Sequence, residues 1–125
     1  MKSNYQNPEL WGSHAWMFLH CISYTYPEDP SLRDQQHYLK FFDSLQFVLP
    51  CKICQKHYAD YLKKHPIKNA LKSKAKLSEY IFKLHTYINT HFKNQENLTI
   101  EQSRNLFENK CIQTNITLRS RFSLV

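Results

Sequence analysis

Glycine is almost missing from this 125-residue chain, because Gly12 is the only one. The 5 prolines fall near the ends of segments with helical periodicity. Tight hairpin turns between strands depend on glycine, often in Asn-Gly or Asp-Gly pairs. The scarcity of glycine therefore argues against an all-β fold and favours helices.

Long apolar runs are missing as well. No stretch approaches the roughly 18 consecutive apolar residues that a membrane-spanning helix needs. The first eight residues are polar, which is not the pattern of a secretory signal. We therefore expect a soluble chain that is not conventionally secreted and has no membrane partner.

Acidic residues are outnumbered, with 10 Asp and Glu against 17 Lys and Arg and a net charge of +7. A basic surface attracts polyanions. The lysines are scattered, however, and the densest group, at 63–76, follows no recognised nucleic-acid motif. We predict a solvated basic loop and no nucleic-acid partner, although an acidic protein or a phosphate-bearing cofactor would also suit this surface.

Apolar residues make up 42% of the chain and aromatic residues 14%, enough for one folded domain over residues 1–125. We place its core at about 10–112 and a tail at 113–125. Apolar spacing predicts an all-α fold with helices over 11–24, from Ser31 to Pro50, from Cys51 onward, over 77–92, and a short fifth from Thr99. Ser31 and Asp34 resemble a capping box. The residues predicted on buried helix faces include Trp11, Ala15, Phe18, Leu19, Ile22, Tyr38, Phe41, Phe42, Leu45, Val48, Leu77, Ile81, Leu84 and Phe92.

Cys51 and Cys54 follow Pro50 and open one of these helices. Two thiols at this spacing can close into a disulfide, and the N–H groups of a first helical turn stabilise a thiolate. Cys54 shares a helix side with apolar residues, while Cys51 lies nearer the rim. We therefore predict a redox pair in which Cys54 faces inward and Cys51 is reachable.

Two helices carry polar groups where a plain core would have hydrocarbon. Trp16 and His20 share one face of the first helix, and His85 and Asn89 share one face of the fourth. A single histidine of this kind is most often a satisfied core residue. Together with His57 and an inward cysteine, the set is typical of a bundle core that encloses a flat, polar-edged molecule.

Four segments, Trp11 to His20, Tyr26-Pro27, Pro50 to Tyr58 and Leu84 to Asn89, resemble the Erv/ALR family of FAD-linked sulfhydryl oxidases in order and spacing. The resemblance covers about residues 10–92. It implies a four-helix bundle with a short fifth helix that encloses FAD and holds no metal. It also implies an enzyme that forms disulfides in protein thiols, with O₂ as electron acceptor and hydrogen peroxide as product.

The resemblance also implies roles and partners. Cys54 would lie beside the flavin, and Cys51 would exchange with incoming thiols. Expected partners are a protein dithiol or a thioredoxin-like redox carrier, O₂, and a second copy of the chain in a homodimer. The short chain is similar to minimal family members such as those of large DNA viruses. This resemblance implies a location in the host cytoplasm or virion if the protein is viral, and otherwise in the mitochondrial intermembrane space. The further residues assigned to the cofactor are Trp11, Gly12, Trp16, His20, His57, Tyr58, His85, Asn89 and His91.

Some positions depart from the family pattern. Thr86 stands where many members have Asn, and His91 stands where many have another basic residue. The fourth helix has no cysteine, so the second structural pair of many members is missing. We expect Cys21 to be a buried, inert thiol and Cys111 a packed one, with an intersubunit disulfide or a Cys21–Cys111 disulfide as the alternatives for Cys111.

Two other interpretations stay open from the residues alone. Cys51, Cys54 and His57, with His65 or Cys111, also have a spacing that permits a zinc site in an interaction domain. A zinc site would not explain why the Trp16/His20 and His85/Asn89 pairs lie on the faces of the first and fourth helices. A thioredoxin-like carrier also begins a helix with two cysteines, but that fold needs strands which the sequence does not indicate.

Overall fold

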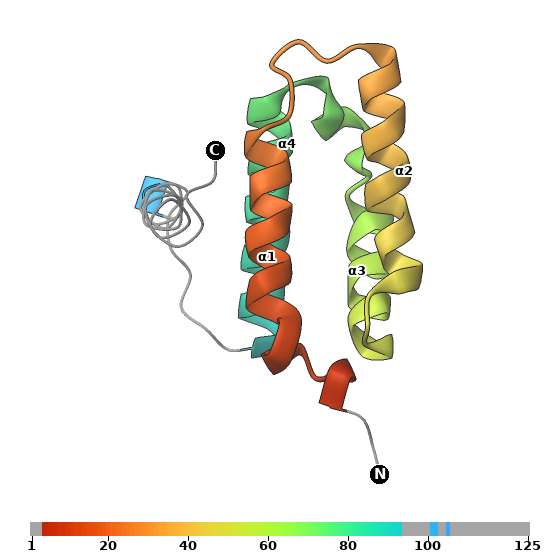
Figure 1. Ribbon diagram of the computed structural model, residues 1–125, viewed down its shortest axis with the longest axis vertical. Coiled ribbons are helices and arrows are strands. Elements are labelled where there is room, and N and C mark those ends of the chain that lie inside the picture. The colour runs from red at the N-terminus through yellow and green to blue at the C-terminus, as the bar shows by residue number, and fades with distance from the viewer. Residues whose placement is uncertain (1–3, 94–100, 103–104, 106–125) are drawn as a thin grey trace, which may run out of the picture. The chain divides into compact units, whose positions relative to one another are not determined.

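The computed structural model describes residues 4–93, 101, 102 and 105. Residues 1–94 form one compact unit and residues 95–125 a second. No strand occurs among the described residues, and the predicted all-α class is confirmed. The first unit contains four α-helices and three short helical turns (Figure 1): η1 (Asn4–Gln6), α1 (Pro8–Tyr24), α2 (Leu32–Val48), α3 (Lys52–Lys64), η2 (Ile67–Lys72), α4 (Lys74–Ile88) and the π-helical η3 (Asn89–Lys93).

Local capping explains where the helices begin. The predicted capping box is present at α2, where the Ser31 hydroxyl and the Asp34 carboxylate each accept from the other's backbone N–H. α1 starts three residues before the predicted Trp11, because Asn7 Oδ1 accepts from the Glu9 N–H at 3.0 Å and Pro8 needs no partner at a first helical position. The predicted fifth helix at Thr99 and Cys111 lie outside the described residues.

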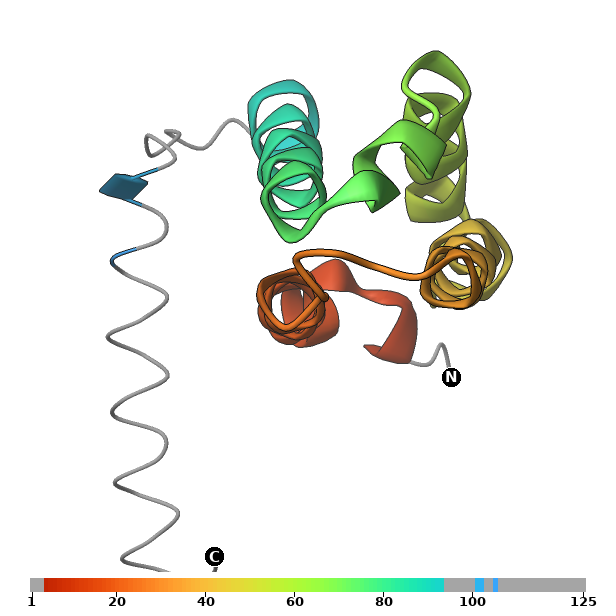
Figure 2. The same cartoon turned by 90° about the horizontal axis from the view of Figure 1, so that it is seen from above.

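The helices of this unit pack as two pairs, α1 with α4 and α2 with α3, as seen from above in Figure 2. η2 contacts both α4 and α2 and closes one end of the unit. The sequence predicts only a solvated lysine-rich loop here. Lys68 and Lys72 are indeed exposed, but the segment forms a 3-10 helix whose Ile67 and Leu71 are buried in the core. The junction of α2 and α3, which carries the two cysteines, lies at the opposite end (Figure 1).

The most deeply buried side chains lie around η2. The Tyr26 hydroxyl donates to the Leu71 carbonyl at 2.7 Å, so the α1–α2 loop is tied to η2. The Ser78 hydroxyl donates to the Ser23 carbonyl at 3.3 Å and joins α4 to α1. The apolar core at this end consists of Leu19, Tyr26, Phe42, Ile67, Leu71, Leu77 and Ile81.

Three residues predicted on buried faces are exposed in the described unit: Phe18 by 58%, Val48 by 66% and Phe92 by 44%. Each α-helix packs mainly on one other α-helix, so its buried stripe is narrower than its apolar stripe. Phe18 instead contacts Phe41 of α2 edge to face, with ring centroids 6.3 Å apart. No helix among the described residues combines the length and the apolar character needed to cross a membrane.

Candidate functional site

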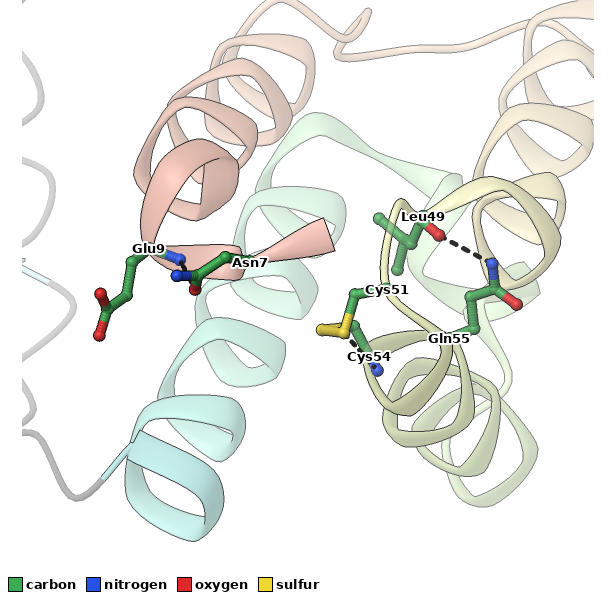
Figure 3. The surroundings of a disulfide bond; sticks show 6 residues. All are labelled: Asn7, Glu9, Leu49, Cys51, Cys54 and Gln55. Atoms are coloured by element: carbon green, nitrogen blue, oxygen red, sulfur yellow. Dashed lines mark hydrogen bonds between the residues drawn. A yellow bond between two sulfur atoms is a disulfide. The ribbon is translucent and has the colours of Figure 1, made fainter. Parts of the chain in front are cut away.

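Cys51 and Cys54 form a disulfide at the start of α3, with their Cα atoms 5.2 Å apart (Figure 3). Cys51 is the N-cap of α3, and its Sγ accepts from the Cys54 N–H at 3.2 Å. The N-terminus of a helix carries partial positive charge, which favours a thiolate over a neutral thiol. The predicted pair is therefore placed where it can exchange between disulfide and dithiol.

The predicted order of accessibility of the two cysteines is wrong. Cys51 is buried, at 8% exposure, whereas Cys54 is half-buried. The prediction assumes helical geometry for both residues, but the Cys51 backbone is extended, with φ −162° and ψ 119°. A cap residue does not follow helical spacing, and the Cys51 sulfur folds back over the helix end.

Trp16, His20 and His85 come together between α1 and α4. The Trp16 and His85 rings stack, with centroids 4.1 Å apart and planes 10° from parallel. His20 Nε2 lies 3.0 Å from His85 Nδ1 in a hydrogen bond, so one ring donates and the other accepts. Burial lowers the pKa of His20, because an imidazolium loses hydration there. Three of the four residues predicted as pairs on two helices, Trp16, His20 and His85, thus form one polar aromatic cluster.

The first turns of α1 hold Trp11 and Gly12. Gly12 is buried, and its missing Cβ leaves room beside α1. Trp11 Nε1 is the one buried side-chain N or O atom among the described residues that has no hydrogen-bond partner. A buried N–H without an acceptor costs free energy, so this indole is a donor available to a bound molecule.

His57 of α3 stacks on Phe92 of η3, with ring centroids 3.5 Å apart and planes 13° from parallel. Burial, followed by the charge of Lys56, lowers the pKa of His57, and Asp60 opposes this. The stack joins α3 to the turn that follows α4. Our prediction of site residues missed Phe92, whose only sequence signal was its place on the apolar side of the fourth helix.

The remaining predicted residues have separate surroundings. The Tyr58 hydroxyl is buried and donates to the Phe42 carbonyl of α2, and burial raises its pKa. Asn89 is half-buried and begins η3, a π-helical turn of a kind often found at functional sites. His91 is exposed, and its Nδ1–H donates to the Tyr87 carbonyl at 3.0 Å. Cys21, predicted to be buried, is half-buried.

The zinc interpretation finds no support. Both sulfurs that it requires are joined in a disulfide. Among the described residues, no group of three or more His, Cys, Asp or Glu side chains is placed to hold a metal ion.

Comparison with known proteins identifies relatives. The model of the Erv1 / Alr family matches residues 13–111. A protein of Acanthamoeba polyphaga mimivirus named "Probable FAD-linked sulfhydryl oxidase" is 37% identical over 84 residues, which are 66% of this chain and 59% of that protein. A relative from Invertebrate iridescent virus 3, named for the same activity, is 32% identical over 83 residues, which are 66% of this chain and 56% of that protein. The chain thus spans less than two thirds of the length of these two relatives.

The fold has a known counterpart as well. The crystal structure of the yeast Erv1 core superposes with a TM-score of 0.73 at 19% identity, covering 88% of this chain and 87% of that one. This likeness concerns the helical fold alone. Because the family model matches most of the sequence, including both cysteines of the disulfide, the chain belongs to the Erv1/Alr family.

Proposed function

We propose that this chain is an FAD-dependent sulfhydryl oxidase that forms disulfide bonds in protein thiols. The observation that carries the proposal is the Cys51–Cys54 disulfide at the N-terminus of α3. The names of the two viral relatives, both FAD-linked sulfhydryl oxidases, support it. The substrate would be a protein dithiol or a thioredoxin-like redox carrier.

The residues around the two helix pairs fit FAD. The stacked rings of Trp16 and His85 offer a flat surface to an aromatic cofactor. The Trp11 indole supplies an N–H donor that has no acceptor within the described chain, and Gly12 allows close approach to α1. FAD bound there would supply the oxidant for the reduced cysteine pair, and its two electrons would go on to O₂ to give hydrogen peroxide. His20, His57, Tyr58, Asn89 and His91 complete the proposed set.

The cysteine pair exchanges with substrate in two steps. A substrate thiolate attacks one sulfur of the Cys51–Cys54 bond, which breaks, and the other sulfur leaves as a thiolate. A second substrate thiolate then attacks the mixed disulfide, so the substrate leaves oxidised and the pair remains as the dithiol. The N-terminus of α3 stabilises the thiolate in both steps.

We assign Cys51 to exchange with substrate and Cys54 to the cofactor side. Cys54 and His57 are three residues apart and share one face of α3. The ring of His57 contacts η3, which follows α4. A cofactor held by α1, α4 and η3 therefore lies on the Cys54 side. The burial of Cys51 opposes the assignment. The experiment that decides compares the rates at which the Cys51→Ser and Cys54→Ser variants react with the oxidised, disulfide form of a substrate. The variant whose remaining thiol reacts faster identifies the sulfur that exchanges with substrate.

Oxygen consumption with dithiothreitol tests the proposed activity. We expect the wild type to be active, and we expect the rate of Cys51→Ser to fall by roughly 100-fold or more, because the remaining thiol cannot regenerate the disulfide. The variant should keep the yellow flavin absorption. Cys21→Ala, which changes a cysteine outside the pair, should retain activity. A wild-type protein that neither carries nor takes up FAD would contradict the proposal.

We also propose that the chain forms a homodimer. Phe18 of α1 and Phe41 of α2 contact each other, and Phe18 remains largely exposed. These two rings join the helix pairs in one apolar surface, which a second copy would remove from water. Light scattering should give the mass of two chains, and the mass of one chain at micromolar concentration would oppose the proposal.

A further inference from the structure

The turn that places Cys51 is short and tightly bonded. α2 ends at Val48, and the Leu49 N–H still donates to the Leu45 carbonyl at 3.0 Å. The Cys51 N–H then donates back to the Leu49 carbonyl at 2.8 Å, across the single residue Pro50. A bond across one residue is a γ-turn, a common way to leave a regular element. The position of Cys51 thus depends on the Leu49 carbonyl.

Gln55 holds this turn from the other side. Its side chain reaches from the first turns of α3 back to the end of α2 (Figure 3). The amide nitrogen Nε2 donates to the Leu49 carbonyl at 2.7 Å and to the Phe47 carbonyl at 3.3 Å. Carbonyl groups at the end of a helix have no partner within the helix, and the two N–H groups of the Gln55 amide fill that need.

The backbone of the same residue adds a further bond. The Gln55 N–H donates to the Cys51 carbonyl at 2.9 Å, while the Cys54 N–H donates to Cys51 Sγ. Cys51 is therefore fixed through its own N–H, its carbonyl and its sulfur. The backbone of the Leu49–Cys51 turn therefore cannot rotate while the Gln55 amide is hydrogen-bonded to the Leu49 carbonyl.

We propose that Gln55 is a positioning residue that holds Cys51 as the N-cap of α3 and so keeps its sulfur at the positive end of the helix. The inference rests on the proposed redox function, since it concerns the reactivity of the Cys51–Cys54 pair. Without the Gln55 amide, the Leu49–Cys51 turn loosens. The Cys51 sulfur then leaves the helix end for part of the time, and its thiolate is less stabilised.

Charged groups near the pair are the same in wild type and variants. Lys52 and Lys56 are exposed on α3, and Lys56 pairs with Asp60 at 3.2 Å. The carboxylate of Glu9 at the start of α1 points away from the disulfide in Figure 3. His57 lies one turn along α3 from Cys54. A change in the titration of Cys51 on substitution of Gln55 therefore reports the hydrogen bonds of the amide.

The experiment measures the pH dependence of alkylation of Cys51 by iodoacetamide in a Cys54→Ser background, with the Cys51 peptide quantified by mass spectrometry. Adding Gln55→Ala should raise the midpoint by about half a pH unit, which is roughly a threefold smaller thiolate fraction near neutral pH. Gln55→Met has a side chain of similar length without charge and without an N–H donor, so it should raise the midpoint as well. This second variant keeps the inference testable if Gln55→Ala does not fold.

Gln46→Ala is the matched control. The Gln46 amide donates to the Asp43 carbonyl at 2.9 Å and to Asp43 Oδ1 at 3.0 Å, within α2 and away from the turn. Its midpoint should equal that of the Cys54→Ser parent.

Equal midpoints in all four proteins would overturn the inference, and so would a shift in Gln55→Ala that Gln55→Met does not share. The assay needs neither FAD nor oxygen, so it is separate from the oxygen-consumption test. Failure of the proposed function would appear only in that test.

Discussion

The two ends of the four-helix unit differ in how their side chains are buried. At the end closed by η2, Leu71, Leu77 and Ile81 are fully buried, and the few polar groups are hydrogen-bonded. At the opposite end, Cys54 and Asn89 are half-buried, whereas Cys51 and Gly12 are buried. Reactive and ligand-binding groups need access, whereas the apolar core does not. We therefore expect stability to depend mainly on the first end and chemistry on the second.

Substitution in the η2 end should have the largest effect on stability. Leu77→Ala removes a fully buried side chain and should cost about 2–5 kcal/mol of unfolding free energy, from lost burial and the cavity left behind. Urea unfolding measures this. At a temperature where the variant is folded, its FAD affinity should match that of wild type. A large loss of affinity in the folded variant would mean that the two ends are not separate.

Substitution in the cluster of Trp16, His20 and His85 should mainly lower the affinity for FAD. Trp16→Ala and His85→Ala each remove one ring of the stack and should weaken FAD binding by roughly tenfold, the effect of losing an aromatic contact and its buried area. Because the two rings contact each other, the double variant should lose less than the product of the single losses. Titration of the apoprotein with FAD measures all three, and full additivity would show that the rings bind independently.

The smallest expected effect is the pH dependence of stability from His20. Burial lowers the pKa of His20 from its usual 6.5. Above that value both the folded and unfolded states hold a neutral ring. As the pH falls below it, the unfolded state binds a proton that the folded state does not, so stability declines until the pH reaches the folded pKa.

Urea unfolding at about pH 7.5 and about pH 5.5 should show this decline in wild type and a smaller one in His20→Asn. Part of the decline should remain, because the pKa of His57 is lowered too. If the unfolding free energy declined equally in wild type and in His20→Asn, the pH dependence would come from groups other than His20.

Predictions from the sequence were most accurate where the chemistry is local. The Ser31–Asp34 capping box and the start of α3 at the two cysteines depend on residues within one helical turn, and both are present. Burial was less predictable. Phe18 and Val48 lie on apolar stripes, but which part of a stripe is covered depends on where the neighbouring helix lies.

The site divides in the same way. The sequence by itself determined the all-α class, the disulfide spacing and the residue types around it, because helical periodicity and a two-residue gap act within a single element. Only the tertiary structure decided that Trp16 stacks on His85, that Phe92 covers His57 and that Gln55 bonds the end of α2. It also decided that Cys51 is the more buried of the two cysteines. These contacts join different elements, and their geometry follows from how helices pack, which the spacing of residues along one helix does not contain.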